Sequence, residues 1–303
     1  MESEKVMDWA ASRAEHKPAS SLRRGRDTME FIVKMVFLLC GFVAVGCVLF
    51  ICIYLIIAGL PAILEIGVTD FLFGTEWAGK QEKFGILPFI LTSVAGTAGA
   101  VLVGVPIGLM TAMFLAKVAP PKAAKVIRTA VELLAGIPSM VYGLVGMMVF
   151  IQLMGLKAGI LAGGLTLVVM ILPTIIRTTQ ESLKTVPQSY REGALGLGAG
   201  KWHMIRTVVL PNAVDGIVTG CILAVGRIVG ESAALLFTAG FGTVLYSFGE
   251  ALNNSSATLT VALYLYANER GRTDIAFAIA AILMILTLVI NLSASLVGKK
   301  LKK

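Results

Sequence analysis

Two opposite charges lie close together inside an otherwise apolar stretch of the chain. Arg227 and Glu231 both fall within the segment 212–240, and a helix would place them one turn apart on the same face. Burying one charge at the centre of a bilayer costs about 2.5–3.5 kcal/mol, so such residues face a partner or a wet pathway. An arginine can donate two hydrogen bonds to a phosphate-like anion, with the carboxylate offsetting its charge in the empty state. A self-neutralising pair that only locks helix packing is the alternative.

A second candidate is the Gly-rich stretch 192–211, in which Lys201 directly follows Gly200. A phosphate-binding P-loop needs the pattern G-x-x-x-x-G-K-[ST]. Here Gly196 is one residue too close to Gly200, and Trp202 stands where a Ser or Thr would hold Mg²⁺. We therefore expect that the chain binds no ATP through this loop.

The same stretch instead has the signals of a short helix and a turn. Pro187 ends the preceding segment, and Ser189 and Glu192 have the spacing of a capping box, with Ser189 as the N-cap. The pattern predicts a helix over about 190–197 and a break at Gly198, where a left-handed conformation is easy for glycine.

A second short helix is expected to begin near Lys201, and Pro211 is expected to open the next long helix. The result would be a helix–turn–helix knob between two apolar segments, suited to docking into a groove on a soluble partner. An ordinary connector is the alternative. One side of the second helix would carry Trp202, Ile205 and Val209.

The elements that must position these residues are membrane-spanning helices. Of the 303 residues, 57% are hydrophobic and only 15% are charged, whereas soluble domains carry about 25% charged residues. Crossing a bilayer takes roughly 20 apolar residues in a helix. The sequence therefore predicts an all-α membrane protein with six spans at about 31–60, 85–116, 131–156, 158–177, 212–240 and 274–298.

The distribution of Lys and Arg predicts the orientation. These residues concentrate before residue 35, in the links 117–128 and 177–206, and at 299–303. Short loops rich in Lys and Arg stay in the cytoplasm, so both termini are expected inside the cell, with 61–83 and 241–273 outside. The basic ends would contact membrane lipid, which explains the net charge of +8 without nucleic acid. Residues 1–28 are expected to form a polar cytoplasmic tail before a permease domain over 29–303.

Other chemistry has little support in the sequence. His16 and His203 are far apart, and the four cysteines lie in apolar segments without a C-x-x-C pattern, so we expect neither a metal site nor a cofactor. A membrane-embedded enzyme would need a nucleophile–base pair or a metal in the spans, and the sequence offers only the Arg–Glu pair.

Small residues one helical turn apart predict close packing between the spans, and prolines within or near the spans predict kinks. The GxxxG pairs are Gly104–Gly108, Gly159–Gly163, Gly216–Gly220 and Gly226–Gly230, and the prolines include Pro88, Pro106, Pro138 and Pro173.

The stretch 192–211 also resembles the EAA signature of binding-protein-dependent ABC importer permeases. Glu192, Ala194, Gly198, Leu210 and Pro211 match it, although Gly193 stands where Ala is usual and Val208 where Ile is usual. In that family the signature marks a cytoplasmic coupling helix, which seats in the ATPase subunit. The resemblance implies the fold of a six-helix, type I importer permease.

Three longer stretches resemble the phosphate-specific transport permeases, whose two related subunits are called PstC and PstA. They are "ELLAGIPSMVYG" (132–143), "LPTIIRTTQESLKTVPQSYREGALGLGAGKW" (172–202) and "GRIVGESAALLFTAG" (226–240). "FLFGTEW" followed by "FGILPFI" favours PstC, whereas "GESAALLFTAG" is closer to PstA. The likeness covers about residues 60–298.

The resemblance implies a prokaryotic cell-membrane permease that moves inorganic phosphate inward and is not itself an enzyme. The implied partners are a second homologous permease subunit, a cytoplasmic ATPase dimer and an extracytoplasmic phosphate-binding protein. The resemblance also favours a role for Arg227 and Glu231 in the substrate pathway. Two alternatives stay open, namely a secondary transporter or channel for an anion, and an ABC permease for another oxyanion.

Overall fold

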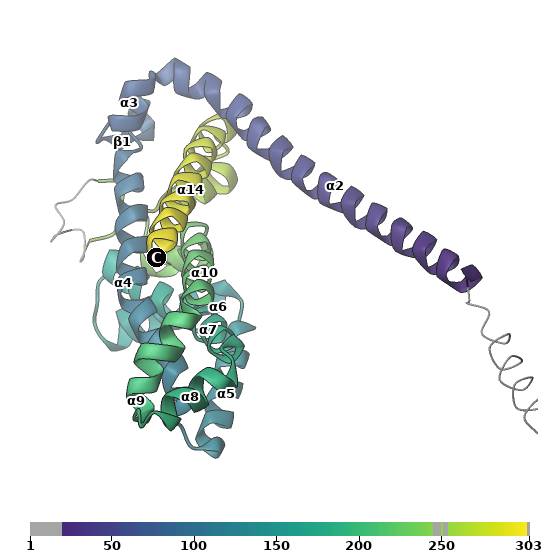
Figure 1. Ribbon diagram of the computed structural model, residues 1–303. Coiled ribbons are helices and arrows are strands. Elements are labelled where there is room, and N and C mark those ends of the chain that lie inside the picture. Colours follow the sequence, from purple (N-terminus) through teal and green to yellow (C-terminus); the bar gives the residue numbers. More distant parts are fainter. Residues whose placement is uncertain (1–19, 245–249, 251–253, 302–303) are drawn as a thin grey trace, which may run out of the picture. The chain divides into compact units, whose positions relative to one another are not determined.

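The computed structural model describes residues 20–244, 250 and 254–301, and nearly all of this part is helical (Figure 1). The chain divides into two units, residues 1–54 and 55–303. In the first unit, the described residues belong to helix α2 (Ser20–Ile66), whose apolar side chains from Met29 to Tyr54 are largely exposed. Most of the predicted tail, 1–28, lies outside the described residues.

The second unit contains the end of α2 and the remaining elements. In chain order these are α3 (Val68–Phe73), β1 (Trp77–Ala78), η1 (Gly79–Gln81), β2 (Lys83–Phe84), α4 (Leu87–Lys117), α5 (Pro121–Ala135), α6 (Ser139–Gly146), η2 (Met147–Leu153), α7 (Ile160–Thr185), α8 (Gln188–Gly196), α9 (Lys201–Met204), η3 (Ile205–Val209), α10 (Leu210–Val229), α11 (Ala233–Thr238), α13 (Leu259–Tyr264), η4 (Leu265–Glu269) and α14 (Thr273–Leu301). Strands β1 and β2 pair antiparallel.

Within the described residues, five helical stretches are long and apolar enough to cross a membrane, and a sixth span arises if α5 and α6 with η2 are counted as one broken span. The helix axis bends by 105° between these two pieces. The sequence predicted one span over 131–156 with a kink at Pro138, and the structure has a full break at that proline. The chain breaks there because Pro138 has an extended conformation, with ψ of 144°, and Ser139 starts a new helix.

Helix α7 lies between α4 and α10, and glycines allow the close approach on both sides. A Cβ atom at Gly104 would lie 2.8 Å from Ile171 Cδ1, and one at Gly108 would lie 2.7 Å from Ile175 Cγ2. On α10, a Cβ at Gly220 would collide with the Thr178 hydroxyl of α7. The predicted role in close packing is therefore confirmed for Gly104–Gly108 and Gly216–Gly220. It is wrong for Gly226–Gly230, because a Cβ at Gly226 would meet only Asn291, at an ordinary distance of 3.7 Å, and one at Gly230 only the carbonyl of Gly226.

The end of the bundle that carries α3 and β1 is closed by an aromatic cluster. Trp77 and Phe84 are buried, and Trp77 packs edge to face against Phe84, Phe89 and Tyr266. Phe71 is also fully buried, whereas Phe73 is exposed. The buried aromatic residues stabilise the fold at this end.

The segment 241–273, predicted as an outer loop, contributes to the core. Leu259, Val261 and Ala262 of α13 are buried, and α13 packs against α4 and α14. Its first turn is capped by the hydroxyl of Thr258, which accepts a hydrogen bond from the backbone N–H of Val261 at 3.4 Å.

Candidate functional site

The predicted knob is present at the end of the bundle where α8 and α9 lie (Figure 1). Helix α8 runs over Gln188–Gly196, Gly198 has φ of +82°, and α9 begins at Lys201. The backbone N–H of Gly198 donates to the carbonyl of Leu195 at 3.0 Å and closes the turn. The left-handed break at Gly198 and the second helix from Lys201 are therefore confirmed.

The predicted capping box is wrong. The N-cap is Pro187, without a side-chain cap hydrogen bond, and Ser189 and Glu192 both lie inside the exposed part of α8. The helix starts earlier because Pro187, with φ of −53° and ψ of 141°, already turns the chain into it. Its carbonyl accepts from the N–H of Tyr190 at 3.2 Å, so no serine cap is needed at that position.

The inner side of the knob is apolar and buried. Ile205 and Val209 are buried in a cluster with Leu183, Met204 and Ala213, and Ala194 packs against the same cluster. Trp202, expected on the same side as Ile205 and Val209, instead has 62% of its surface exposed. This cluster fixes the knob to the ends of α7 and α10.

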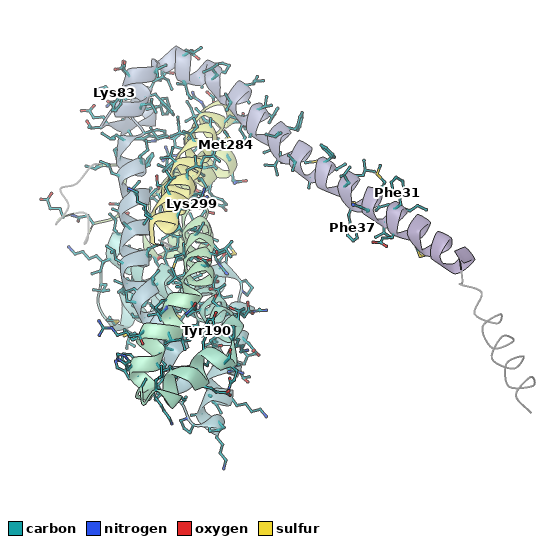
Figure 2. The ribbon with its side chains drawn as sticks, viewed as in Figure 1. Phe31, Phe37, Lys83, Tyr190, Met284 and Lys299 are labelled. Carbon is teal, nitrogen blue, oxygen red and sulfur yellow. The ribbon has the colours of Figure 1, made fainter. Side chains whose placement is uncertain are left out.

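The outer side of the knob exposes large apolar side chains that nothing in this chain covers within the described residues. Tyr190, labelled in Figure 2, is half exposed. Leu197 has 92% of its surface exposed at the tip of the turn, and Leu195 is also exposed. A surface of this kind is typical of an interaction site.

The knob is also tied to α7 by Arg191, a residue that the sequence did not single out. Its guanidinium Nη2 donates to the backbone carbonyl of Leu183 in the last turns of α7. A cation at the C-terminal end of a helix satisfies carbonyls that have no intrahelical partner. Nothing in the spacing around Arg191 marks it, because an arginine on a short polar helix is usually a solvated surface residue.

Leu210 and Pro211 begin α10, as expected for the proline. However, no break precedes them. Residues Lys201–Val229 form one helical stretch, because the π-helical segment η3 joins α9 to α10. A proline inside a helix removes one N–H donor and crowds the preceding carbonyls, and a π-helical turn is one way to accommodate it. The knob is thus continuous with the span that carries Arg227.

The structure does not place Arg227 and Glu231 on one helical face, so this prediction is wrong. Helix α10 ends at Val229, and Glu231 lies in the break before α11. The helix ends at Gly230, its C-cap, because glycine is unfavourable inside a helix. No ion pair joins Arg227 to Glu231 in the described structure.

Glu231 instead holds the break together. Its carboxylate Oε1 accepts from the backbone N–H of Ala234 at 3.0 Å, which caps α11. Its backbone carbonyl accepts from the hydroxyl of Thr260 on α13 at 2.8 Å. Glu231 is buried, with 9% of its surface exposed. It therefore links α10, α11 and α13 at one point.

Beside this break lies a small cavity of about 20 Å³, large enough for one water molecule, whose largely apolar wall includes several hydroxyl groups. Ser93, Thr97, Thr258 and Thr260 contribute to its wall and are buried. The hydroxyl of Ser93 accepts from the N–H of Leu259 at 2.9 Å. The centre of the bundle therefore has polar lining next to Glu231.

Arg227 itself is exposed on α10 and makes no ion pair within the described residues. It lies within electrostatic range of the phenol of Tyr142 on α6. Its guanidinium is therefore not neutralised by an ion pair within the described residues.

Charged residues at the far end of the bundle are paired locally. The ammonium group of Lys83 lies 2.7 Å from Glu76 and holds the pKa of that carboxyl below its usual value. Arg272 pairs with Asp274 at 2.9 Å. Within the described residues, no three His, Cys, Asp or Glu side chains come together as a metal site.

Residues 104–303 match the family described as binding-protein-dependent transport system inner membrane component. The chain is 34% identical over 255 residues to the probable ABC transporter permease YqgH of Bacillus subtilis, covering 81% of this chain and 82% of the relative. It is 33% identical over 248 residues to the phosphate transport permease PstC of Haemophilus influenzae, covering 73% and 77%. It is also 33% identical over 216 residues to PstA 2 of Mycobacterium tuberculosis, covering 69% and 71%.

Among solved structures, a bacterial alginate ABC transporter in complex with its alginate-bound periplasmic protein shares the fold. The TM-score is 0.62 at 17% identity, with 89% of this chain and 97% of that chain covered. The family places the chain in the membrane as a transport permease, with ATP hydrolysis on a separate subunit. The family match, these relatives and the shared fold together show that the chain belongs to the binding-protein-dependent transport system inner membrane components, the permeases of ABC importers.

Proposed function

We propose that the chain is a permease subunit of an ATP-driven importer of inorganic phosphate. The observation that carries the importer role is the knob, whose buried side is fixed to α7 and α10 and whose exposed side offers Leu197 and Trp202 to a partner. The substrate assignment is supported by the similarity to PstC and PstA and by Arg227, whose charge no ion pair neutralises within the described residues. The stretches around 71–90 favour the PstC role.

The partners in this proposal are a second homologous permease, a cytoplasmic ATPase dimer and an extracytoplasmic phosphate-binding protein. Ser189, Glu192 and Gly198 belong to the surface that meets the ATPase, and Ala194 holds that helix against the buried cluster. Leu210 and Pro211 begin the span that receives its movement. Since η3 joins α9 to α10 without a break, a displacement of the knob is expected to move α10 as well.

In the pathway, Arg227 is proposed to contact the anion, because its fork can bind two phosphate oxygens at once. The structure leads us to propose a different role for Glu231 from the one that the sequence suggested. Its carboxylate holds the break between α10 and α11, so we propose that it positions the pathway and is not the direct counter-ion of Arg227.

The test is phosphate uptake by the reconstituted complex in proteoliposomes, measured beside membrane abundance. Arg227→Gln is expected to abolish uptake while the complex still assembles, and Arg227→Lys to keep part of the activity. Lys122→Gln, which removes a surface charge from α5, is the control and should transport normally. Wild-type rates of phosphate uptake in Arg227→Gln would contradict the pathway role, and uptake of another oxyanion in place of phosphate would contradict the substrate.

Glu231 is tested separately. Glu231→Gln keeps an oxygen that can accept from Ala234, whereas Glu231→Ala removes the acceptor. Positioning through the cap predicts that Glu231→Gln transports and Glu231→Ala does not. A direct electrostatic role would make the two variants equally defective.

A further inference from the structure

A charged groove runs between α5 and α7, apart from the residues proposed for the pathway. Its volume is about 400 Å³. Helix α5 contributes residues spaced by three and four, and helix α7 does the same, so one face of each helix forms a wall. The lining residues are Arg128, Val131, Glu132, Ala135, Pro173, Arg177, Gln180, Glu181 and Lys184.

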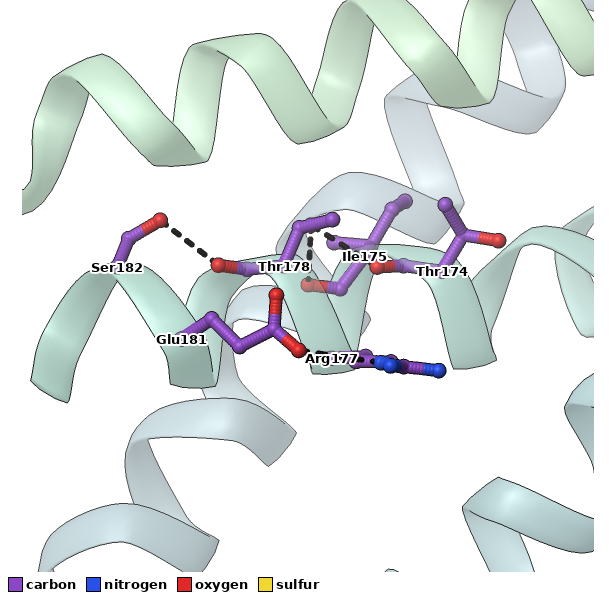
Figure 3. Close-up of polar contacts among 6 residues, drawn as sticks. All are labelled: Thr174, Ile175, Arg177, Thr178, Glu181 and Ser182. Atoms are coloured by element: carbon purple, nitrogen blue, oxygen red, sulfur yellow. Dashed lines mark hydrogen bonds and ion pairs between the residues drawn. The ribbon is translucent and has the colours of Figure 1, made fainter. Parts of the chain in front are cut away.

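Three basic side chains line the groove against two acidic ones, which leaves an excess of positive charge. Arg177 Nε lies 3.1 Å from Glu181 Oε1, one turn further along α7 (Figure 3). These side chains are 70% and 60% exposed. An exposed pair of this kind is weak, so Arg177 can exchange its partner for an anion. Arg128 and Lys184 form no ion pair within the described residues.

Figure 3 also shows which side of α7 is involved. Thr178 and Ser182 lie on a different side of the helix from the Arg177–Glu181 pair, about 100° around its axis, because each follows its neighbour by one residue. Their hydroxyl groups donate to carbonyls one turn earlier in α7, and they face the glycines of α10. The charged face of α7 is therefore not used for packing against α10.

Gln180, one of the residues that line the groove, carries a buried and unsatisfied donor. Gln180 has only 7% of its surface exposed, and its Nε2 has no hydrogen-bond partner within the described residues. Buried polar groups in proteins are nearly always paired, and an unpaired amide N–H is costly. An anion oxygen in the groove would supply the missing acceptor.

The position of α5 favours a membrane-surface ligand. This helix is amphipathic, has no buried side chain, and exposes Val126 and Leu133. Such helices lie in the plane of the membrane boundary. Basic pockets between helices at the cytoplasmic boundary bind phosphate-bearing headgroups.

We propose that the groove between α5 and α7 binds a phosphate group, presented either by an anionic lipid headgroup or as free phosphate. Arg128, Arg177 and Lys184 supply the charge, and the Gln180 amide donates to one phosphate oxygen. The site does not depend on phosphate being the transported substrate, because Arg227 and Glu231 do not line it.

The experiment compares two double variants of the purified permease complex. Arg128→Gln with Lys184→Gln removes two charges from the groove. Lys122→Gln with Lys125→Gln removes two charges from α5 outside the groove and is the matched control. Binding is measured by native mass spectrometry with phosphatidylglycerol, with neutral diacylglycerol and with inorganic phosphate.

With about 1 kcal/mol per basic residue near a membrane surface, the groove variant should lose roughly thirtyfold in affinity for phosphatidylglycerol. The control should stay close to the parent protein. Release of bound phosphatidylglycerol by inorganic phosphate would show that either source fills the site, and phosphatidylglycerol binding without phosphate binding would assign it to the lipid. Equal losses in the two double variants, equal binding of neutral diacylglycerol, or binding of neither phosphate source would overturn the proposal.

A second variant keeps the test independent of charge. Gln180→Met preserves the volume of the side chain and removes the amide donor. It should weaken phosphate-group binding and raise the thermal unfolding midpoint of the lipid-free protein, because the unpaired donor is gone. Unchanged binding in this variant would remove Gln180 from the site.

Discussion

The indole N–H of Trp77 donates to the hydroxyl of Tyr266 at 2.8 Å and joins two parts of the chain far apart in sequence. Both residues are buried. The same hydroxyl accepts from Arg270 Nη1 at 2.7 Å, so Tyr266 pairs with two donors at once. The segment 76–84 is thereby fixed to the segment before α14.

This relationship predicts an asymmetry between two substitutions. Tyr266→Phe should destabilise the protein by about 1–3 kcal/mol, since it leaves the buried Trp77 donor without an acceptor. Phe73→Leu, at an exposed aromatic residue, is the control and should have little effect. Thermal unfolding in detergent measures both, and equal midpoints for Tyr266→Phe and the parent would contradict the argument.

Gly198 should tolerate no side chain, whereas Gly196 should. Both positions have open space around them, but only Gly198 has a positive φ, of 82°. A left-handed conformation costs an ordinary residue about 1–2 kcal/mol. Gly198→Val is expected to uncouple ATP hydrolysis from transport while membrane insertion continues, and Gly196→Ala to leave both intact. Full coupling in Gly198→Val would make the knob an ordinary connector.

Arg191 should control the order of α8. Arg191→Met keeps much of the side-chain length and removes the donor to the Leu183 carbonyl. Hydrogen exchange of the amides in 188–196 is expected to become faster, while exchange in α14 stays the same. Equal exchange rates in α8 of the variant and the parent protein would show that the apolar cluster alone holds the knob.

The proposed orientation can be tested with single cysteines in a background that lacks the four native ones. Gln81, next to β1, and Ser189, on α8, are both exposed, and these two elements lie at opposite ends of the second unit (Figure 1). Gln81→Cys should react with an impermeant maleimide in intact cells, and Ser189→Cys only after the membrane is opened. The reverse pattern would invert the topology.

Much of the architecture follows from the sequence, because charge-free windows and small-residue spacing are set by the bilayer itself. Gly104, Gly108 and Gly220 pack as the spacing predicted. Gly198 likewise has the left-handed conformation that the sequence predicted from its being a glycine.

The candidate site was less predictable, since it depends on where helices stop. A helical spacing placed Arg227 and Glu231 together, but Gly230 and the residues after it gave the chain a break that periodicity does not reveal. At Pro138, by contrast, the residue type itself indicated a kink, and the structure breaks the span there. The sequence did not indicate that Thr258 and Thr260 are buried. Their hydroxyls hydrogen-bond to each other within the local turn, and the Thr260 hydroxyl donates to the carbonyl of Glu231, which is distant in sequence. Arg191 was missed because its partner is a backbone carbonyl.

The π-helical segment Ile205–Val209 contains one residue more than an α-helix of the same length needs. Removing one residue there would leave Trp202 and Arg227 pointing in their present directions, whereas adding one would rotate Trp202 by about 100° around the helix axis. The shortened chain would also need Pro211→Ala, because a continuous α-helical ladder requires the N–H that proline lacks. Relatives that lack the proline are therefore the ones in which a one-residue gap in this segment should occur.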